Sequence, residues 1–159
     1  DPPYYQQNVK QLFPPASLTK LFTASASLLY LKPSFRYKTN LYYTGAISQN
    51  TLHGDIYINF TGDPSLTSSN LYDLLASLKT HHITRITGHI YCVANAFDAH
   101  PYPNGMTIDD LAYNYASPIS SIIINENSFK ITLTPTTDDS APGIRFPSSL
   151  PVTFNNLLS

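Results

Sequence analysis

The sequence predicts an α+β fold in which an N-terminal helix is followed by a strand-rich body that carries one long helix. Three observations lead to this prediction. Apolar residues recur at three- and four-residue intervals over 14–31, which is typical of a helix. Polar and apolar residues alternate over 36–44 and over 52–61, which is typical of strands. A second stretch with helical spacing covers 67–79.

Length and composition set the outer limits. The chain has 159 residues, of which 42% are hydrophobic and 12% are charged, so it can bury the core of one domain, or of one domain plus a fragment. Its net charge is −1 without a basic cluster, so we expect no nucleic-acid partner. No apolar run approaches the about 20 residues of a membrane span. Asp1-Pro2-Pro3 does not resemble a signal peptide, so we expect any export signal to be absent from this sequence.

The first helix brings a serine and a lysine together. Pro14 and Pro15 precede it and Pro33 ends it, which places Ser17 and Lys20 in the first turn. Residues three apart share a helix face, with Cβ atoms about 5–6 Å apart. A serine hydroxyl needs an adjacent base to act as a nucleophile. A lysine can be that base where burial, positive charge or the helix dipole favours its neutral form. The alternative is a capping serine beside a solvated lysine.

The strands and the second helix follow in order. The loop 45–50 is predicted to join the first two strands into a hairpin, and Gly62-Asp63-Pro64 ends the second strand. Residues 67–70 cap the long helix, and His81-His82 close it. Four leucines are expected on its inner face: Leu71, Leu74, Leu75 and Leu78.

The remaining third of the chain is less regular. A third strand is predicted over 83–94 with a break at Gly88, and a loop over 98–106 is dense in turn-forming residues. Further predicted elements are one short helical turn over 108–115, a hairpin of 119–124 and 128–135 with its turn at 125–127, and a last strand over 152–154.

Cysteine and histidine offer no second chemistry. Cys92 is the only cysteine, which excludes an internal disulfide, and we predict it to be a buried strand residue. A catalytic thiol is rejected because His89, three residues away on a strand, lies on the opposite face. The five histidines lack the spacing of metal ligands, so we expect no metal site.

Several motifs carry a resemblance to a known family. The first, residues 15–20 followed by Thr23-Ala24, resembles the active-site helix of penicillin-binding proteins and serine β-lactamases. Later segments resemble the class C low-molecular-mass penicillin-binding proteins, the D-alanyl-D-alanine carboxypeptidase/endopeptidases of peptidase family S13. In that family's order, these are Phe35-Arg36-Tyr37-Lys38-Thr39, Leu52-His53-Gly54-Asp55-Ile56, Gly62-Asp63-Pro64-Ser65-Leu66, Ala116-Ser117-Pro118 and Asn125-Glu126-Asn127.

The resemblance implies a domain organisation and a reaction. Residues 1–33 would be part of a transpeptidase-like domain, related to serine β-lactamases, that is split by a long insertion. Residues 34–159 would form most of the inserted domain. Ser17 would attack the penultimate D-alanine of a peptidoglycan stem peptide, and Lys20 would accept its proton. This reaction calls for no metal or organic cofactor. Stem peptides and β-lactam antibiotics are the implied partners, and the bacterial periplasm is the implied location.

Two further residues follow from the same resemblance. The family places an acidic residue of the inserted domain near the active site, where it contacts the free amino end of the stem peptide's diamino acid. Asp110 matches that position, six residues before the Ala116-Ser117-Pro118 motif, and Tyr115 matches an aromatic residue of the same pocket. The alternative is that Asp109 or Asp110 caps a short helix.

The chain also departs from the family pattern. Ser48-Gln49-Asn50 and Ser68-Ser69-Asn70 have the letters of the family's Ser-x-Asn, but they fall in a predicted hairpin loop and at a helix cap. Lys38-Thr39-Asn40 lacks the glycine of Lys-Thr-Gly. Removing one oxyanion donor alone slows such reactions by about 10²–10³, so we expect this chain to be the inactive N-terminal part of an enzyme.

A second interpretation stays open. The chain would then be a non-catalytic peptidoglycan-binding or structural module in which Ser17 and Lys20 are vestigial. For the isolated chain of the first interpretation, a helix without its catalytic domain exposes its apolar face, so homodimerisation or displacement of the helix is expected. Peripheral association with the membrane or the cell wall is left open.

Overall fold

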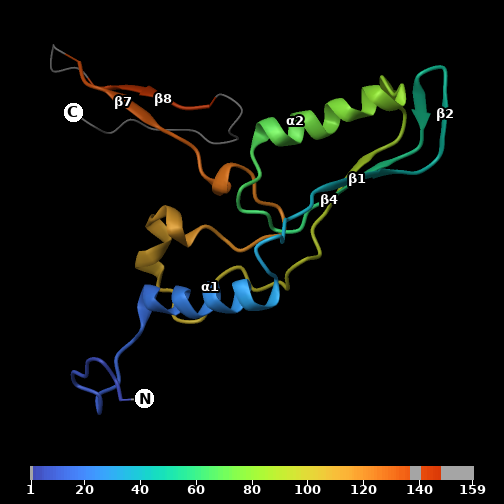
Figure 1. Ribbon diagram of the computed structural model, residues 1–159. Coiled ribbons are helices and arrows are strands. Elements are labelled where there is room, and N and C mark those ends of the chain that lie inside the picture. The colour runs from blue at the N-terminus through green and yellow to red at the C-terminus, as the bar shows by residue number, and fades with distance from the viewer. Residues whose placement is uncertain (1, 137–140, 148–159) are drawn as a thin grey trace. The chain divides into compact units, whose positions relative to one another are not determined.

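The computed structural model describes residues 2–136 and 141–147. The chain divides into two compact units, Asp1–Arg36 and Tyr37–Ser159. Two α-helices and several short strands make this a mixed α and β structure, in agreement with the predicted fold class (Figure 1).

The first unit consists of one helix and its flanking segments. A 3-10 turn, Ala16–Leu18, leads directly into α1 (Thr19–Tyr30). The helix ends where the Leu31 backbone N–H bonds to the Ser27 carbonyl at 2.9 Å and Lys32 turns the chain with φ +70°. The helix predicted over 14–31 is therefore present, with its first turn wound more tightly than an α-helix. Every described residue of this unit is exposed.

The second unit opens with one long, bent hairpin. Its outer strands, β1 (Asn40–Tyr43) and β4 (Ile56–Asn59), pair antiparallel. Its tip, β2 (Ala46–Ser48) and β3 (Thr51–His53), also pairs antiparallel. The prediction of a loop over 45–50 is thus wrong, because this segment contains the strand β2. The turn is the dipeptide Gln49-Asn50, with φ values of +46° and +60°, as a two-residue hairpin turn requires.

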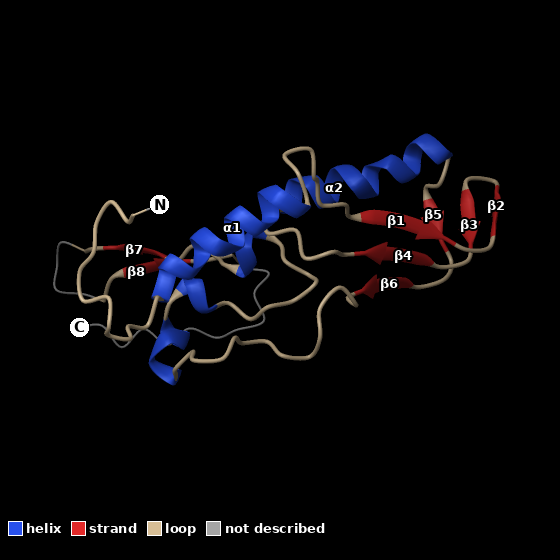
Figure 2. Ribbon diagram, turned by 60° about the horizontal axis from the view of Figure 1, so that its bottom comes forward, coloured by secondary structure: helices blue, strands red, loops and turns tan. Residues whose placement is uncertain are grey.

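Helix α2 carries the chain from this hairpin to two further strands. It spans Ser68–Ala76 and continues as a 3-10 helix, Ser77–His81. The strands β5 (Arg85–Ile86) and β6 (Ile90–Val93) then run parallel to β3 and β4. The results are two three-stranded sheets, β2-β3-β5 and β1-β4-β6 (Figure 2). The third strand predicted over 83–94 is present as β5 and β6, divided near Gly88.

The strands pass from one sheet to the other at a seam of closely spaced backbone. A Cβ on Gly54 would meet the Thr44 carbonyl oxygen, and a Cβ on Gly88 would meet the Asp55 carboxylate and the Gly54 carbonyl. Glycine is therefore needed where these strands approach one another. The Asp55 carboxylate also accepts a 2.7 Å hydrogen bond from the His89 backbone N–H, which joins the two strands at the seam.

The hydrophobic core of the second unit lies between the sheets and α2. Burial alternates along β4, where Ile56 and Ile58 point inward and Tyr57 and Asn59 are half-buried. The leucines expected on the inner face of α2 do pack on this core, Leu78 as a buried residue. The other buried members are Leu52, Phe60, Leu66 and Ile83, with Leu41, Ile86, Ile122 and Ile124 packed around them.

A row of tyrosines crosses the opposite face of the β1-β4-β6 sheet. Tyr42, Tyr57 and Tyr91 are direct register partners on the three strands. The rings of Tyr57 and Tyr91 stack with centroids 5.1 Å apart and planes 17° apart. Residues along β4 therefore alternate between the two faces of the sheet. One face holds the core, and the other holds an aromatic surface.

The prediction that Cys92 is buried is wrong, because its side chain is exposed. Cys92 is the register partner of the buried Ile58, so it lies on the core face of the sheet. However, β6 is an edge strand, and its neighbour Ile90 on that face is also 54% exposed. The described part of the core covers β1 and β4 and stops short of β6.

The predicted hairpin of 119–124 and 128–135 is also wrong. The backbone of 119–125 bonds to separate loops: Ser121 O accepts from Gly62 N at 2.8 Å, and Asn125 N donates to Leu66 O at 2.9 Å. The turn over 125–127 does exist, with three successive left-handed residues. The strand β7 (Thr132–Thr134) pairs instead with β8 (Gly143–Arg145). The strand predicted over 152–154 lies outside the described residues.

None of the helices in the described part of the chain has the length and apolar character that a membrane span requires.

Candidate functional site

The predicted nucleophile lies in the turn that starts the first helix. Ser17 is the middle residue of the 3-10 turn, which is closed by a 3.0 Å hydrogen bond from Leu18 N to Pro15 O. The preceding residue, Ala16, has φ +44°. A left-handed conformation costs a non-glycine residue roughly 1–2 kcal/mol. Such local strain is often found at functional sites, and here it directs the chain from the two prolines into the helix.

Lys20 follows one turn later as the second residue of α1. Ser17 and Lys20 are both exposed and are three residues apart on continuous helical backbone. This spacing leaves the two side chains on one face, within reach of each other. Between these two described side chains no hydrogen bond is formed. Their roles as nucleophile and base therefore remain a prediction.

The second predicted pair, Asp110 and Tyr115, forms a hydrogen-bonded cluster. Asp110 lies in a 3-10 helix, Ile108–Ala112, that begins after Thr107. Its Oδ2 accepts hydrogen bonds from the Thr107 backbone N–H at 2.8 Å and from the Thr107 hydroxyl at 2.9 Å. Its Oδ1 accepts a 2.9 Å hydrogen bond from the Tyr115 hydroxyl. The structure thus brings Asp110 and Tyr115 together.

These bonds determine the ionisation of both groups. The Thr107 backbone N–H, followed by the Tyr115 hydroxyl and the Thr107 hydroxyl, lowers the pKa of the Asp110 carboxyl. The same hydrogen bond to Asp110, assisted by slight desolvation and by the carboxylate charge, raises the pKa of the Tyr115 phenol. At neutral pH the cluster therefore presents a carboxylate beside a protonated phenol.

Two members of this cluster, Thr107 and Tyr113, were not predicted from the sequence. Thr107 is the N-cap of the 3-10 helix and forms a capping box with Asp110. The Tyr113 ring stacks on Tyr115, with centroids 5.3 Å apart and planes 8° apart. The pattern Thr-x-x-Asp, a variant of the capping-box sequence, was a signal that could have revealed Thr107. The alternative that Asp110 serves as a cap is therefore correct in part, because it caps in partnership with Thr107.

The two predicted pairs lie in different units of the chain. Ser17 and Lys20 belong to Asp1–Arg36, and Asp110 and Tyr115 belong to Tyr37–Ser159. Each pair has a defined local geometry within its own unit. Among the described residues, no group of three histidine, cysteine, aspartate or glutamate side chains could hold a metal ion.

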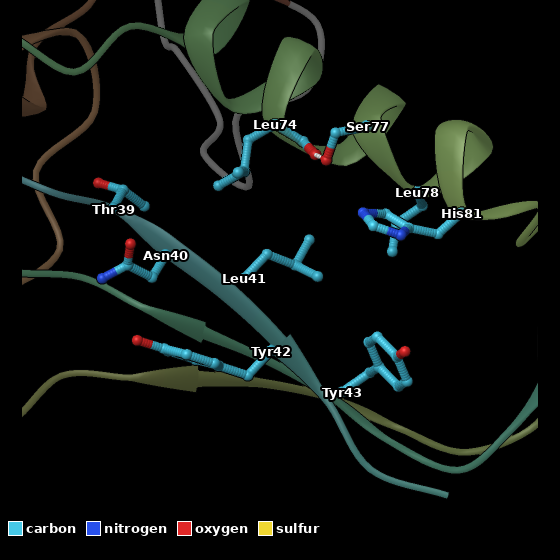
Figure 3. Close-up of a pocket in the computed structure, with 9 residues that line it drawn as sticks. All are labelled: Thr39, Asn40, Leu41, Tyr42, Tyr43, Leu74, Ser77, Leu78 and His81. Atoms are coloured by element: carbon cyan, nitrogen blue, oxygen red, sulfur yellow. Dashed lines mark hydrogen bonds between the residues drawn. The ribbon is translucent and has the colours of Figure 1, made fainter. Parts of the chain in front are cut away.

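The second unit also has a cavity of about 300 Å³ between β1 and the α2 region. Figure 3 shows Leu41 and Tyr43 on the side of β1 that faces the helix, with Tyr42 on the opposite side. Leu74, Leu78 and His81 close the cavity from above. Its lining mixes apolar and polar side chains and contains none of the four predicted site residues.

The two Ser-x-Asn sequences lie at a hairpin turn and at a helix cap, as predicted. Ser48 ends β2, and Gln49 and Asn50 form the hairpin turn. In the other sequence, Asn70 Oδ1 accepts a 3.0 Å hydrogen bond from Thr67 N at the start of α2. Both sequences are therefore accounted for by a turn and by a helix cap.

Known proteins resemble this chain along most of its length. The model of the D-Ala-D-Ala carboxypeptidase 3 (S13) family matches residues 1–158. The D-alanyl-D-alanine carboxypeptidase DacB of Haemophilus influenzae is 38% identical over 114 residues, which covers 72% of this chain and 24% of that protein. The chain thus spans about a quarter of the length of this curated relative.

Solved structures show the same likeness in three dimensions. The crystal structure of penicillin binding protein 4 (dacB) from Haemophilus influenzae superposes with a TM-score of 0.77 at 34% identity, covering 87% of this chain and 31% of that one. A second crystal structure of that protein, complexed with a novel β-lactam, gives a TM-score of 0.65 at 31% identity and covers 91% and 29% of the two chains.

Proposed function

Because the chain belongs to the D-Ala-D-Ala carboxypeptidase 3 (S13) family, we propose that it is part of a serine D-alanyl-D-alanine carboxypeptidase/endopeptidase that acts on peptidoglycan peptides in the bacterial periplasm. The observation that carries this proposal is the Ser17-x-x-Lys20 sequence at the start of α1 in a chain of this family. Residues 1–33 are then part of the penicillin-binding domain, and residues 34–159 form an inserted domain.

The reaction is an acyl transfer through a covalent intermediate. Ser17 Oγ attacks the carbonyl carbon of the penultimate D-alanine while Lys20 Nζ accepts the hydroxyl proton. The tetrahedral intermediate collapses to an ester on Ser17, and the terminal D-alanine leaves after receiving a proton. Water then hydrolyses the ester and regenerates the serine. A β-lactam is attacked at its ring carbonyl, the ring opens, and the ester is hydrolysed slowly.

The inserted unit contributes to substrate binding in this proposal. The Asp110 carboxylate accepts a hydrogen bond from the free amino end of the diamino acid in the stem peptide, and Tyr115 lines the same pocket. The hydrogen bonds to Asp110 support this role, because they keep the carboxylate ionised and fixed in orientation. A charged acceptor of this kind binds an ammonium group more strongly than a neutral one would.

The isolated 159 residues are proposed to be inactive. They contain no Lys-Thr-Gly sequence, and both Ser-x-Asn sequences serve as a turn and a cap. The groups that would complete an oxyanion hole and bind the substrate carboxylate are thus lacking. Homodimerisation and peripheral association with the membrane or cell wall stay predictions; the exposed apolar side chains of α1, such as Phe22 and Leu29, favour the first.

The proposal is tested by intact-mass spectrometry after incubation with a penicillin. We expect an adduct on Ser17 in the full-length gene product and none on this chain. Ser17→Ala should remove the adduct, whereas Ser25→Ala, an exposed serine of the same helix, should not. Lys20→Ala should slow acylation by about 10²- to 10⁴-fold, the usual contribution of a general base.

Each other outcome has a definite meaning. An adduct on both proteins would contradict the proposed inactivity of the isolated chain. An adduct on neither would contradict the enzyme assignment and favour a non-catalytic binding or structural module.

A further inference from the structure

With the hydrogen bonds of the described residues counted, the Asp110 carboxylate has one acceptor position left, and its place is determined by two neighbours. A carboxylate offers about four lone-pair positions. Thr107 occupies both positions on Oδ2, through its backbone N–H at 2.8 Å and its hydroxyl at 2.9 Å. The Tyr115 hydroxyl occupies one position on Oδ1 at 2.9 Å. The remaining position is on Oδ1, next to the Tyr115 hydroxyl.

The Tyr115 ring is in turn held by Tyr113. The two rings are nearly parallel, with an interplanar angle of 8° and centroids 5.3 Å apart. Tyr113 has a well-defined backbone, because its N–H bonds to Asp110 O at 3.0 Å and its carbonyl accepts from Ala116 N at 3.0 Å. The tyrosines are 60% and 63% exposed, so the Tyr115 hydroxyl and the acceptor position beside it are accessible to a ligand.

This arrangement fits a ligand that carries only donors. An ammonium group has three N–H donors and no acceptor, so it can bond to the open position on Oδ1 and place its charge beside the Tyr115 hydroxyl oxygen. A second carboxylate in the same turn, Asp109, adds negative charge. A neutral amide offers fewer donors and no charge, and would gain much less.

We propose that Thr107 and Tyr113 are specificity-determining positioning residues, which orient Asp110 and Tyr115 so that the site selects peptides with a free amine over acylated ones. The inference rests on the proposed function. Thr107 fixes the carboxylate and leaves its free acceptor next to Tyr115. Tyr113 fixes the phenol that occupies the neighbouring position.

The test compares two peptides on the full-length gene product. One is Lys-D-Ala-D-Ala with a free side-chain amine, and the other is the same peptide acetylated at that nitrogen. Thr107→Val and Tyr113→Leu should each raise KM for the free-amine peptide by about three- to tenfold with little change in kcat. The KM for the acetylated peptide and the rate of penicillin acylation should not change.

Matched variants separate positioning from folding. Thr107→Ser keeps the hydroxyl and Tyr113→Phe keeps the stacked ring, so both should behave as the unmodified protein does. As a further control, Tyr72→Leu replaces an exposed tyrosine of α2, outside the cluster, and should change neither KM nor kcat. The inference is overturned if the preference for the free amine is unchanged in Thr107→Val and Tyr113→Leu. It is also overturned if these variants lose activity equally toward both peptides and penicillin, which would indicate a purely structural role.

A binding measurement makes the result independent of turnover. The dissociation constants of both peptides are measured in the Ser17→Ala background, with and without the two substitutions. A ratio of dissociation constants that falls toward one in Thr107→Val and Tyr113→Leu supports the inference, and an unchanged ratio overturns it. Failure of penicillin to acylate Ser17 is a separate result, which bears on the proposed enzyme activity alone.

Discussion

At the scale of single residues, Asp110 shows how a short sequence pattern produces a defined electrostatic state. Three hydrogen bonds converge on its carboxylate, and two of them come from Thr107, three residues earlier. Hydrogen bonds to the charged form of a carboxylate stabilise that form. A capping box therefore does two things here: it starts a short helix and it holds an anion in a fixed orientation.

The pH dependence of this cluster follows from the direction of each shift. The pKa of Asp110 is lowered, so its contribution to the turn is complete above the unfolded value of about 3.9 and is lost as the pH falls through the folded value. The pKa of Tyr115 is raised, so its contribution is complete below about 10 and is lost as the pH rises through the folded value. The cluster is thus expected to be intact from about pH 4 to pH 10.

This expectation is checked by NMR titration. The amide shift of Thr107 should change with a midpoint below that of a free aspartate, and Asp110→Asn should abolish the transition. A midpoint at or above the ordinary aspartate value would contradict the observed hydrogen-bond pattern.

Some residue-level features could be predicted from the sequence and others could not. The place of Ser17 in the first helical turn follows from Pro14, Pro15 and the spacing of the leucines. The left-handed Ala16 has no local signal, because alanine normally avoids that conformation. The exposure of Cys92 depends on its position on an edge strand, and strand order is a property of the fold rather than of the local sequence.

At the scale of elements, α2 is the part where local sequence and structure agree most closely. The Thr67 hydroxyl accepts a 3.2 Å hydrogen bond from Asn70 N, and Asn70 Oδ1 accepts from Thr67 N. These bonds satisfy two of the backbone donors that a helix start leaves open. The cap and the leucine spacing were both visible in the sequence, so this helix could be predicted.

Removing this cap should weaken the second unit. Thr67→Ala is expected to lower the free energy of unfolding by about 1 kcal/mol, because the Asn70 N–H loses its side-chain acceptor. Urea unfolding of this chain, followed by circular dichroism, measures the change. Ser69→Ala, an exposed position in the same first turn, should change stability by less than about 0.5 kcal/mol. Equal effects of the two substitutions would argue against a specific cap.

The segment 119–135 shows why alternation can mislead. Its apolar residues suggested two paired strands, but Ile122 and Ile124 pack on the core from an irregular segment. The left-handed turn over 125–127 redirects the chain, and Asn125 bonds instead to the start of α2 through Ser68 N at 3.1 Å. Long-range bonds of this kind override strand propensity.

At the scale of the whole molecule, the fold class and the family could be predicted, while the sheet arrangement could not. The family resemblance inferred from the motifs is confirmed by the family match over residues 1–158. The division of one long hairpin between two sheets depends on two parallel pairings, of β5 with β3 and of β6 with β4, which form after α2 in the chain. Such non-local pairing leaves little trace in local periodicity.

The stability of the second unit depends on a small hydrophobic core. Shortening one fully buried side chain should therefore lower its free energy of unfolding markedly. Leu52 has no exposed surface and lies at the centre of the apolar cluster. Leu52→Ala should lower the free energy of unfolding by about 2–5 kcal/mol, through lost apolar burial and the cavity that remains. Leu28→Ala, at an exposed site on α1, should cost less than about 0.5 kcal/mol. Chemical denaturation of both variants of this chain provides the comparison, and similar midpoints would contradict the assigned core.

The stacked rings of Tyr57 and Tyr91 should contribute a circular dichroism signal in the near ultraviolet. The chain has 12 tyrosines and no tryptophan, so its near-ultraviolet absorption comes from phenol rings. Two rings held face to face in a chiral setting couple their electronic transitions, and coupled phenols give a stronger dichroic band than isolated ones. The stacked pair links β4 to β6, strands that meet only after α2 has carried the chain across. The second stacked pair, Tyr113 and Tyr115, contributes to the same band. The part of the near-ultraviolet band that Tyr91→Leu removes therefore reports when the sheet closes, while the far-ultraviolet signal reports when the helices form.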